Sequence, residues 1–172
     1  MMELTQTQQD FREGMSRLGA AVNLITTDGP AGRHGITASA VCSVTDNPPT
    51  LLVCINTRAF AHDKFVENGV LAVNVLAAEH QELSGIFARF VEGVDRFSFG
   101  NWEAGPTGAP MLTDANVAFD CRITGRQEEG THSVFFCQVE EVRMSAKARH
   151  GLVWFSRDFH HLVTEEQART SP

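Results

Sequence analysis

Several features that mark other classes of protein are missing from this sequence. The apolar runs, such as Leu51–Ile55 and Val70–Leu76, are too short to cross a bilayer. Met1–Thr5 has neither a basic nor an apolar signal segment, so we expect no signal peptide and a cytoplasmic protein without membrane contact. Lys and Arg number 14 against 21 Asp and Glu, a net charge of −7, and no basic run occurs. This acidic balance argues against a nucleic-acid surface.

Motifs for several common chemistries are missing as well. There is no G-x-G-x-x-G for a Rossmann dinucleotide site, no G-x-x-x-x-G-K-[ST] for a nucleoside triphosphate, and no G-x-S-x-G nucleophile elbow. No C-x-x-C pair exists and the seven histidines are scattered, so we expect no metal site. No side chain is expected to act as a nucleophile or general acid.

What remains is the composition of an ordinary globular protein. The chain has 172 residues, 42% hydrophobic and 20% charged, which predicts a single domain over residues 1–172. Trp102 and Trp154 are expected in the core. Four cysteines stand singly in apolar stretches and are expected as buried free thiols, as in a reducing compartment: Cys42, Cys54, Cys121 and Cys137.

The spacing of apolar residues predicts mostly strands with a few helices. Helices are expected at Thr5–Leu18, at Ala59–Asn68, and along the stripe Leu83, Ile86, Phe87 and Phe90. Strands are expected at Ala21–Thr27, Gly35–Thr45, Thr50–Asn56, Val70–Leu76, Val117–Thr124, Ser133–Val142 and Leu152–Phe155. Gly93–Pro110 is expected to be irregular. This order predicts a mainly β, β-rich α+β fold, a small barrel with helices at its ends.

One segment, Gly35–Pro49, is rich in small and hydroxyl-bearing residues. On a strand, such residues leave backbone N–H groups and hydroxyls little shielded by bulk. That suits a flat ring with polar edges lying against the strand. The alternative is an ordinary strand on which another element packs closely.

This segment, together with Thr50–Asn56, resembles the short-chain flavin reductases, which supply reduced flavin to two-component monooxygenases. The resemblance covers nearly the whole chain in order, through Phe11–Met15, Ala20–Thr27, Ala72–Leu76, Gly105–Gly108, Gly130–His132 and Gly151–Arg157. Within the family the chain is most similar to the reductases that serve 4-hydroxyphenylacetate 3-monooxygenase and the pyrimidine-ring oxygenase.

The resemblance implies an FMN-binding split β-barrel with short flanking helices, a homodimer with flavin at the subunit interface. It implies FMN or FAD as cofactor, NADH or NADPH as hydride donor, and an oxygenase as partner. The residues that it implies for cofactor binding are Thr37, Ala38, Ser39, Ser43, Cys54, Ile55, Asn56, Phe87, Ala88, His132, Arg157 and His160.

The resemblance also implies a role for each part of this set. The isoalloxazine would lie along Thr37–Ser39 near Ser43, and the ribityl chain along Cys54–Asn56. Phe87 and Ala88 would approach from the following helix. His132, in Gly130–His132, would help seat the nicotinamide, and a C-terminal segment with Arg157 and His160 would close that side.

Structural roles stay open for several of these side chains. Asn56 can cap a turn, and His132 can hydrogen-bond to backbone where its strand begins. Phe87 belongs to a helix stripe, which favours the core. Arg157 and His160 follow the last predicted strand, where charged groups are usually solvated.

The chain departs from the family pattern at two places. Phe60 and Ala61 stand where many members have Ser and Thr for the flavin phosphate, so Arg58 or Lys64 would have to supply the charge. The second departure is Thr131, which replaces the acidic residue beside the histidine of the Gly-Asp-His motif. Two other functions stay open: flavin-dependent reduction of a cobalt corrinoid, and a non-catalytic flavin- or haem-binding split barrel.

Overall fold

The computed structural model describes residues 4–146 and 149–163. Its helices are α1 (Gln6–Ser16), α2 (His62–Asn68) and α3 (Gln81–Ala88), with 3₁₀ turns η1 (Ala78–His80) and η2 (Arg96–Ser98). Its strands are β1 (Ala20–Ala21), β2 (Asn23–Thr27), β3 (His34–Ala38), β4 (Val41–Asp46), β5 (Pro49–Asn56), β6 (Val70–Val75), β7 (Trp102–Ala104), β8 (Pro110–Leu112), β9 (Val117–Glu129), β10 (His132–Met144), β11 (Gly151–Phe155) and β12 (Asp158–Leu162).

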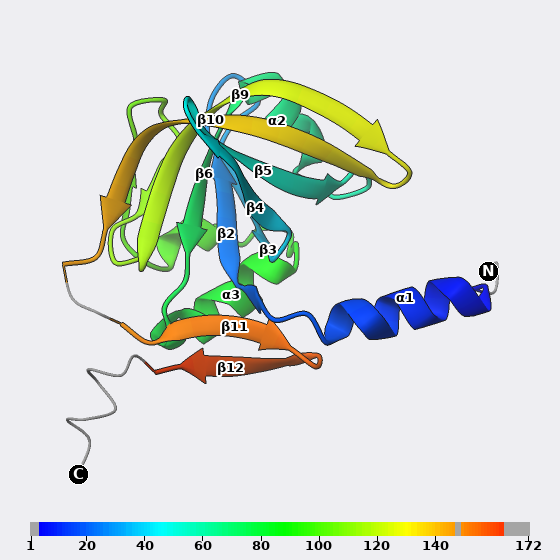
Figure 1. The fold of residues 1–172 in the computed structure, drawn as a ribbon. Coiled ribbons are helices and arrows are strands. Elements are labelled where there is room, and N and C mark those ends of the chain that lie inside the picture. Colours follow the sequence, from blue (N-terminus) through cyan, green and yellow to red (C-terminus); the bar gives the residue numbers. More distant parts are fainter. Residues whose placement is uncertain (1–3, 147–148, 164–172) are drawn as a thin grey trace, which may run out of the picture.

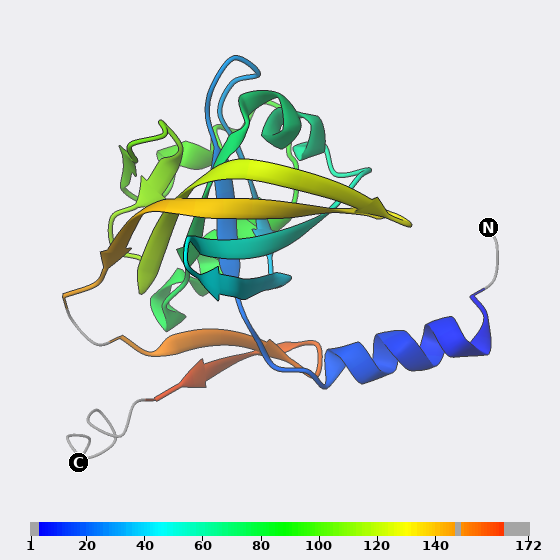
Figure 2. The same cartoon turned by 45° about the horizontal axis from the view of Figure 1, so that its top comes forward.

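Seven antiparallel strands form the barrel, in the order β3-β2-β6-β9-β10-β5-β4 (Figure 1). The two edges of this sheet are β3 and β4, which only Ser39 and Ala40 separate in sequence (Figure 2). The barrel is therefore split at this corner, which confirms the predicted fold. Backbone N–H and C=O groups on the outer side of an edge strand have no neighbouring strand to pair with.

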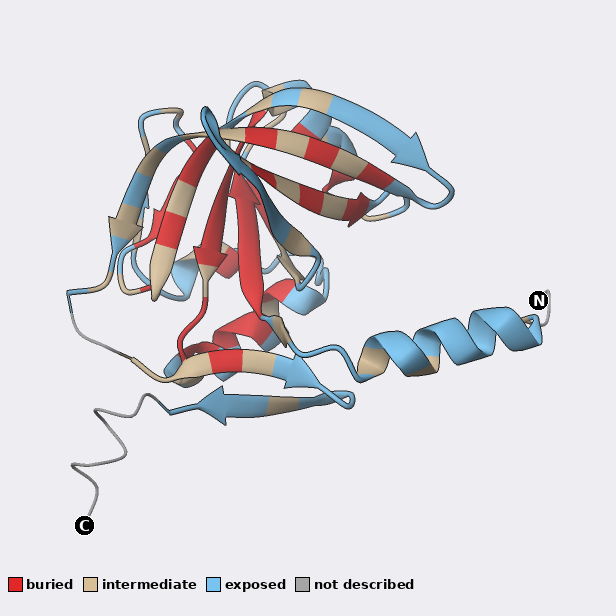
Figure 3. Ribbon diagram, viewed as in Figure 1, coloured by how far each residue is buried: buried red, intermediate tan, exposed pale blue. Residues whose placement is uncertain are grey.

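The core lies on both faces of β2 and β6, the strands that are red along nearly their whole length in Figure 3. Neighbouring residues of a strand point to opposite faces. Leu24 accordingly belongs to one buried cluster, with Phe87 of α3, and Ile25 belongs to the other, with Phe65 of α2. The two helices thus cover different faces of the sheet, and burial on both faces holds α3 beside β3.

The N-terminal helix α1 projects from the barrel and buries none of its residues (Figure 1). It begins at the predicted capping box, in which Thr5 and Gln8 bond to each other's backbone N–H groups. Its C-terminal end contacts the turn of the β11–β12 hairpin, where the Ser156 N–H donates to the Ser16 carbonyl at 2.6 Å. Its apolar side chains, Phe11 foremost, therefore face solvent.

Some sequence predictions were wrong in detail. The expected strand Gly35–Thr45 is two strands, because the chain turns the barrel corner at residues 39–40. The expected irregular stretch Gly93–Pro110 contains η2 and the strand β7, which pairs with β8. Helix α3 ends at Ala88, so Phe90 lies beyond the helix, and β12 was not predicted.

Two burial predictions also need correction. Cys121 and Cys137 are buried, and burial raises the pKa of the Cys137 thiol to about 12. Cys54 is only half-buried and Cys42 is exposed, because both lie on the open side of the β4–β5 edge. Trp154 is 36% exposed and so is no core residue.

Candidate functional site

A pocket of about 330 Å³ opens where β3 runs beside the end of β5 and the last turn of α3. Nine of the twelve residues that the family resemblance implied line it: Thr37, Ala38, Ser39, Cys54, Ile55, Asn56, Phe87, Ala88 and His132. The structure thus brings together four segments that lie far apart in the sequence. Their role as cofactor ligands stays a prediction.

Two contacts hold α3 against β3 and so place Ala88 at the pocket. The Thr37 hydroxyl donates to the Ser84 carbonyl at 2.6 Å. The ring of Phe87, 1% exposed, packs directly on Gly35, where an added Cβ would lie 2.8 Å from Cε1 of the ring. Phe87 is therefore a core residue, as its helix stripe predicted, and it also lines the pocket.

Asn56 and His132 are paired across the β5–β10 ladder at the same end of the pocket. The Asn56 Oδ1 atom accepts from the backbone N–H of Arg58 at 2.9 Å, so the side chain does cap the turn. Within the described residues its Nδ2 has no partner. The Thr131 hydroxyl lies 2.9 Å from Nδ1 of His132. Both side chains are exposed and retain a polar atom for a ligand.

Directly behind His132, a buried hydrogen-bonded chain links β10 to α2. His62 Nε2 lies 2.9 Å from the Ser133 hydroxyl, and Nδ1 lies 2.9 Å from the Asp63 carboxylate. The residue types are those of a hydrolytic triad, but Ser133 is 0% exposed, so no substrate reaches it. These hydrogen bonds fix the start of β10. Sequence analysis did not find it, because 71 residues separate His62 from Ser133.

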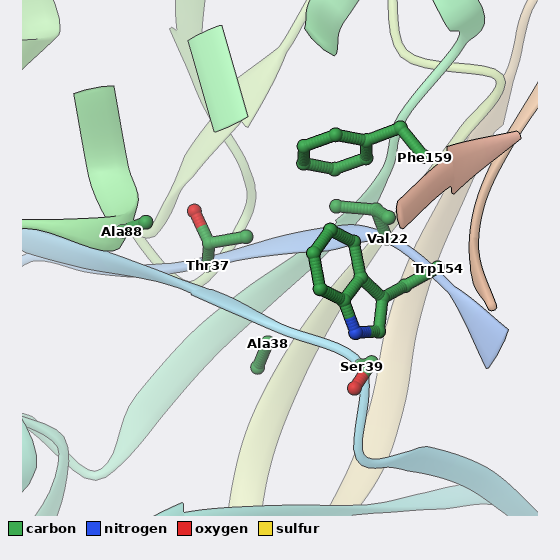
Figure 4. A pocket seen from close by; sticks show the side chains of 7 residues that line it. All are labelled: Val22, Thr37, Ala38, Ser39, Ala88, Trp154 and Phe159. Atoms are coloured by element: carbon green, nitrogen blue, oxygen red, sulfur yellow. The ribbon is translucent and has the colours of Figure 1, made fainter. Parts of the chain in front are cut away.

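A second pocket of about 270 Å³ adjoins the first and shares Thr37, Ala38, Ser39 and Ala88 with it. Its other walls are Trp154 and Phe159 of the β11–β12 hairpin and Val22, which lies between β1 and β2 (Figure 4). The two aromatic rings meet edge to face, with centroids 4.8 Å apart. Phe159 was not predicted, because β12 has no apolar alternation to reveal it.

The remaining three implied residues lie outside both pockets. Ser43 is exposed on β4, opposite Leu51. Arg157 sits in the left-handed turn between β11 and β12 and binds the Glu13 carboxylate of α1 at 2.8 Å. His160 Nε2 lies 3.1 Å from the Phe155 carbonyl, on the face of the hairpin opposite to Phe159.

A buried cation lies behind the pocket, at the C-terminal side of α3. His34 and Arg96 are both buried, and Arg96 Nη2 donates to His34 Nε2 at 2.7 Å. Burial, with the charges of Arg96 and Lys64, lowers the pKa of His34 to about 4, so the imidazole is neutral and accepts this bond. Lys64 donates to the Ala31 carbonyl at 2.6 Å, and Arg58 is exposed.

These features fit the flavin that the resemblance implied. The split edge supplies backbone N–H donors, and Ala38 and Ser39 are small enough to leave them accessible to a flat ring. Asn56 adds an amide donor at the neighbouring strand end. The two adjoining pockets together reach the size range of small-molecule sites. Of the described side chains, no three from His, Cys, Asp and Glu cluster as metal ligands would. No helix in the same part of the chain could span a membrane.

Comparisons with known proteins show the family of the whole chain. A family model described as "Flavin reductase like domain" matches residues 15–163. The FMN reductase (NADH) RutF of Pseudomonas syringae is 52% identical over 162 residues, which cover 94% of this chain and 90% of that protein.

Two solved structures superpose on nearly the whole chain. The NADH:FAD oxidoreductase SgcE6 of Streptomyces globisporus matches with a TM-score of 0.85 at 27% identity, covering 95% of this chain and 99% of that one. BorF, the flavin reductase component of a bacterial two-component tryptophan halogenase, matches with a TM-score of 0.84 at 29% identity, covering 91% and 99%.

Proposed function

Because the chain belongs to the flavin reductase like domain family, we propose that it transfers hydride from NADH to FMN and supplies the reduced flavin to a partner monooxygenase. The observation that carries this proposal is the pocket at the barrel split, which gathers nine of the family's implied cofactor residues. FMN is the flavin named for the relatives that are about half identical in sequence. The chain is an NADH-dependent flavin reductase.

A flavin held here would supply the hydride acceptor and NADH the hydride donor, so the two cofactors would carry the redox chemistry. This chain binds and orients them. The N–H groups among residues 37–39 that point away from β2 would donate to the polar edge of the ring and would stabilise negative charge there. Asn56 donates its amide to the ribityl side. The walls of the two pockets would hold the nicotinamide against the flavin ring.

The second pocket suits the nicotinamide side of the reaction. Its shared wall, Thr37–Ser39, places any ring there next to a ring in the first pocket. Trp154 and Phe159 form its wall on the side of the hairpin. His132 lines only the first pocket, at its other end, so its role in seating the nicotinamide rests on the family resemblance. Arg157 and His160 face away, so their proposed role rests on the family resemblance alone.

We further propose that the protein is a homodimer. Helix α1 exposes an apolar face with Phe11 67%, Met15 48% and Leu18 62% exposed. Met15 and Leu18 line a hollow of about 590 Å³ that continues onto the exposed β4–β5 edge and Trp154. A second copy covering this face would shield both the helix and the flavin pocket. Light scattering of Phe11→Glu should then show monomers where the parent protein shows dimers, whereas a monomeric parent would end this proposal.

Steady-state NADH oxidation by the purified protein tests the proposed activity. We expect saturable oxidation with FMN, a higher KM with FAD, and onward transfer when a flavin-dependent oxygenase is added. A cobalt corrinoid is the matched alternative acceptor: reduction of the corrinoid with no turnover of free FMN would replace the oxygenase role. Flavin binding without any NADH oxidation would leave a binding protein.

A further inference from the structure

Two phenylalanines that adjoin pocket-lining residues in the sequence are more than half exposed and stack on each other. Phe60, 60% exposed, follows the pocket-lining Ala59, and Phe90, 53% exposed, lies two residues beyond Ala88. Their ring centroids are 4.3 Å apart with 25° between the planes. The pair thus joins the segment before α2 to the segment after α3, and leaves flat aromatic surface open to solvent. Exposed aromatic patches of this kind mark binding sites.

Positive charge lies directly beneath this pair. The ring of His34 is 5.2 Å from that of Phe60, and the guanidinium carbon of Arg96 is 5.8 Å from the centroid of Phe90. Arg96 is 6% exposed, and its nearest polar partners are the neutral His34 and the Phe87 carbonyl. Among the described residues no carboxylate pairs with it. A buried cation without a counter-ion makes the surface above it attractive to an anion.

Further cations lie in the same two segments. Arg58 precedes Phe60 by two residues, Arg89 directly precedes Phe90, and both are exposed. Lys64 contributes enough field at His34 to lower the pKa of that imidazole. The same segments also hold the carboxylates Asp63, Glu92 and Asp95, so in a chain of net charge −7 they carry a slight excess of cations.

We propose that the stacked pair Phe60 and Phe90 is a platform for the adenine base of a dinucleotide, whose phosphates lie against the surrounding cations. This inference rests on the proposed function, which places a flavin in the adjoining pocket. A base with a π face and an anionic tail matches an aromatic surface ringed by cations. A mononucleotide such as FMN has no second base to use the platform. FAD and NADH both carry an adenylate, so either can be its source.

The position of the pair explains why it can serve a dinucleotide. Ala59 and Ala88 both line the pocket, and Phe60 and Phe90 follow them in the sequence by one and two residues. The chain departs from its family here, because Phe60 stands where a phosphate-binding hydroxyl is common. Phe60 therefore offers a ring for stacking where a hydroxyl would bind phosphate.

The test compares Phe60→Ala and Phe90→Ala with the parent protein, using Phe99→Ala as a matched control. Phe99 is also an exposed phenylalanine, 45%, and lines neither pocket. Phe60→Trp, which keeps a stacking surface, is the rescue variant. Calorimetry measures the dissociation constants of FMN, FAD and 5′-AMP, and steady-state assays with FMN as acceptor measure KM for NADH and for reduced nicotinamide mononucleotide.

We expect the parent to bind 5′-AMP, and the two alanine variants to lose this binding while their FMN affinity is retained. Loss of the stacking on one base predicts that the dinucleotide which supplies the adenylate binds about five- to tenfold more weakly. Weaker FAD binding by the alanine variants would identify FAD as the dinucleotide on the platform. A higher KM for NADH, with an unchanged KM for reduced nicotinamide mononucleotide, would identify NADH instead. Phe60→Trp and Phe99→Ala should resemble the parent.

Three results would overturn the proposal: no 5′-AMP binding by the parent, unchanged FAD and NADH constants in both alanine variants, or an equal loss of FMN binding. Failure of the proposed function is distinguishable from these. It would appear as absent NADH oxidation in the parent, whereas binding of 5′-AMP and of FAD is measured without turnover.

Discussion

Phe87 packs its ring on the backbone of Gly35 so closely that a Cβ at position 35 would lie 2.8 Å from Cε1. This contact joins α3 to the strand that forms one wall of the flavin pocket. Gly35→Ala must push the ring and the helix outward. We expect a loss of about 1–3 kcal/mol in the free energy of unfolding, together with weaker FMN binding.

Denaturant titration and FMN fluorescence measure the two effects of Gly35→Ala. Gly85→Ala is the control on the same helix, because a Cβ there meets nothing within 4 Å. Alanine is the better helix former, so this control should gain roughly 0.5–1 kcal/mol and bind FMN normally. Equal stability of the two variants would show that α3 is not held by this contact.

The amide of Asn56 offers a second prediction. Its Oδ1 caps the turn to Arg58, and its Nδ2 is available to the flavin. Asn56→Asp keeps the acceptor for the turn but replaces the donor with a negative charge. We expect a melting temperature near that of the parent and an FMN affinity lower by about fivefold to tenfold, the effect of one lost hydrogen bond. Asn56→Leu should lower affinity further, and unchanged affinity in both variants would remove Asn56 from the site.

The Ser133–His62 hydrogen bond predicts a purely structural defect. Ser133→Ala leaves a buried imidazole nitrogen of His62 without its partner, which should cost about 1–3 kcal/mol in the free energy of unfolding. Asp63→Asn should have no measurable effect, because the Asp63 side chain is 98% exposed. The Ser133→Ala enzyme should keep its KM for NADH at low temperature. A large rise in the KM for NADH without destabilisation would instead show that the Ser133–His62 hydrogen bond contributes to NADH binding.

His34 predicts a dependence of stability on pH. Burial, together with Arg96 and Lys64, lowers its pKa from 6.5 to about 4 in the folded protein. Between these values the unfolded chain takes up a proton that the folded chain does not. Stability should therefore be intact above pH 6.5 and fall as the pH drops toward 4. His34→Gln keeps an acceptor for Arg96 but cannot take up the proton, so the loss of stability that is due to His34 between pH 6.5 and 4 should vanish. An unchanged dependence of stability on pH in this variant would contradict the prediction.

The sequence predicted the barrel and most of the pocket because both follow from local patterns and family motifs. The run Gly35–Pro49 was predicted to suit a flat ring, and its first part lines the pocket together with Asn56 and His132. The residues that the motifs name in β3 and β5 all line this pocket, and their role as cofactor ligands stays a prediction.

Contacts between distant residues could not be predicted from such patterns. Strand β12 is mostly exposed and is held by pairing with β11, so no burial pattern revealed Phe159. Arg157 reaches Glu13 across 144 residues of sequence, and that ion pair turns it away from the pocket. The split of Gly35–Thr45 into two strands depends on barrel closure, which no single segment encodes.

Anaerobic mixing of the protein and FMN with NADH tests the central claim most directly. The visible absorbance of the flavin should bleach as an equal amount of NADH is oxidised, and more slowly when the transferred hydrogen of NADH is deuterium. The rate should saturate with NADH. Flavin that is bound to the protein but remains oxidised in the presence of excess NADH would contradict the account.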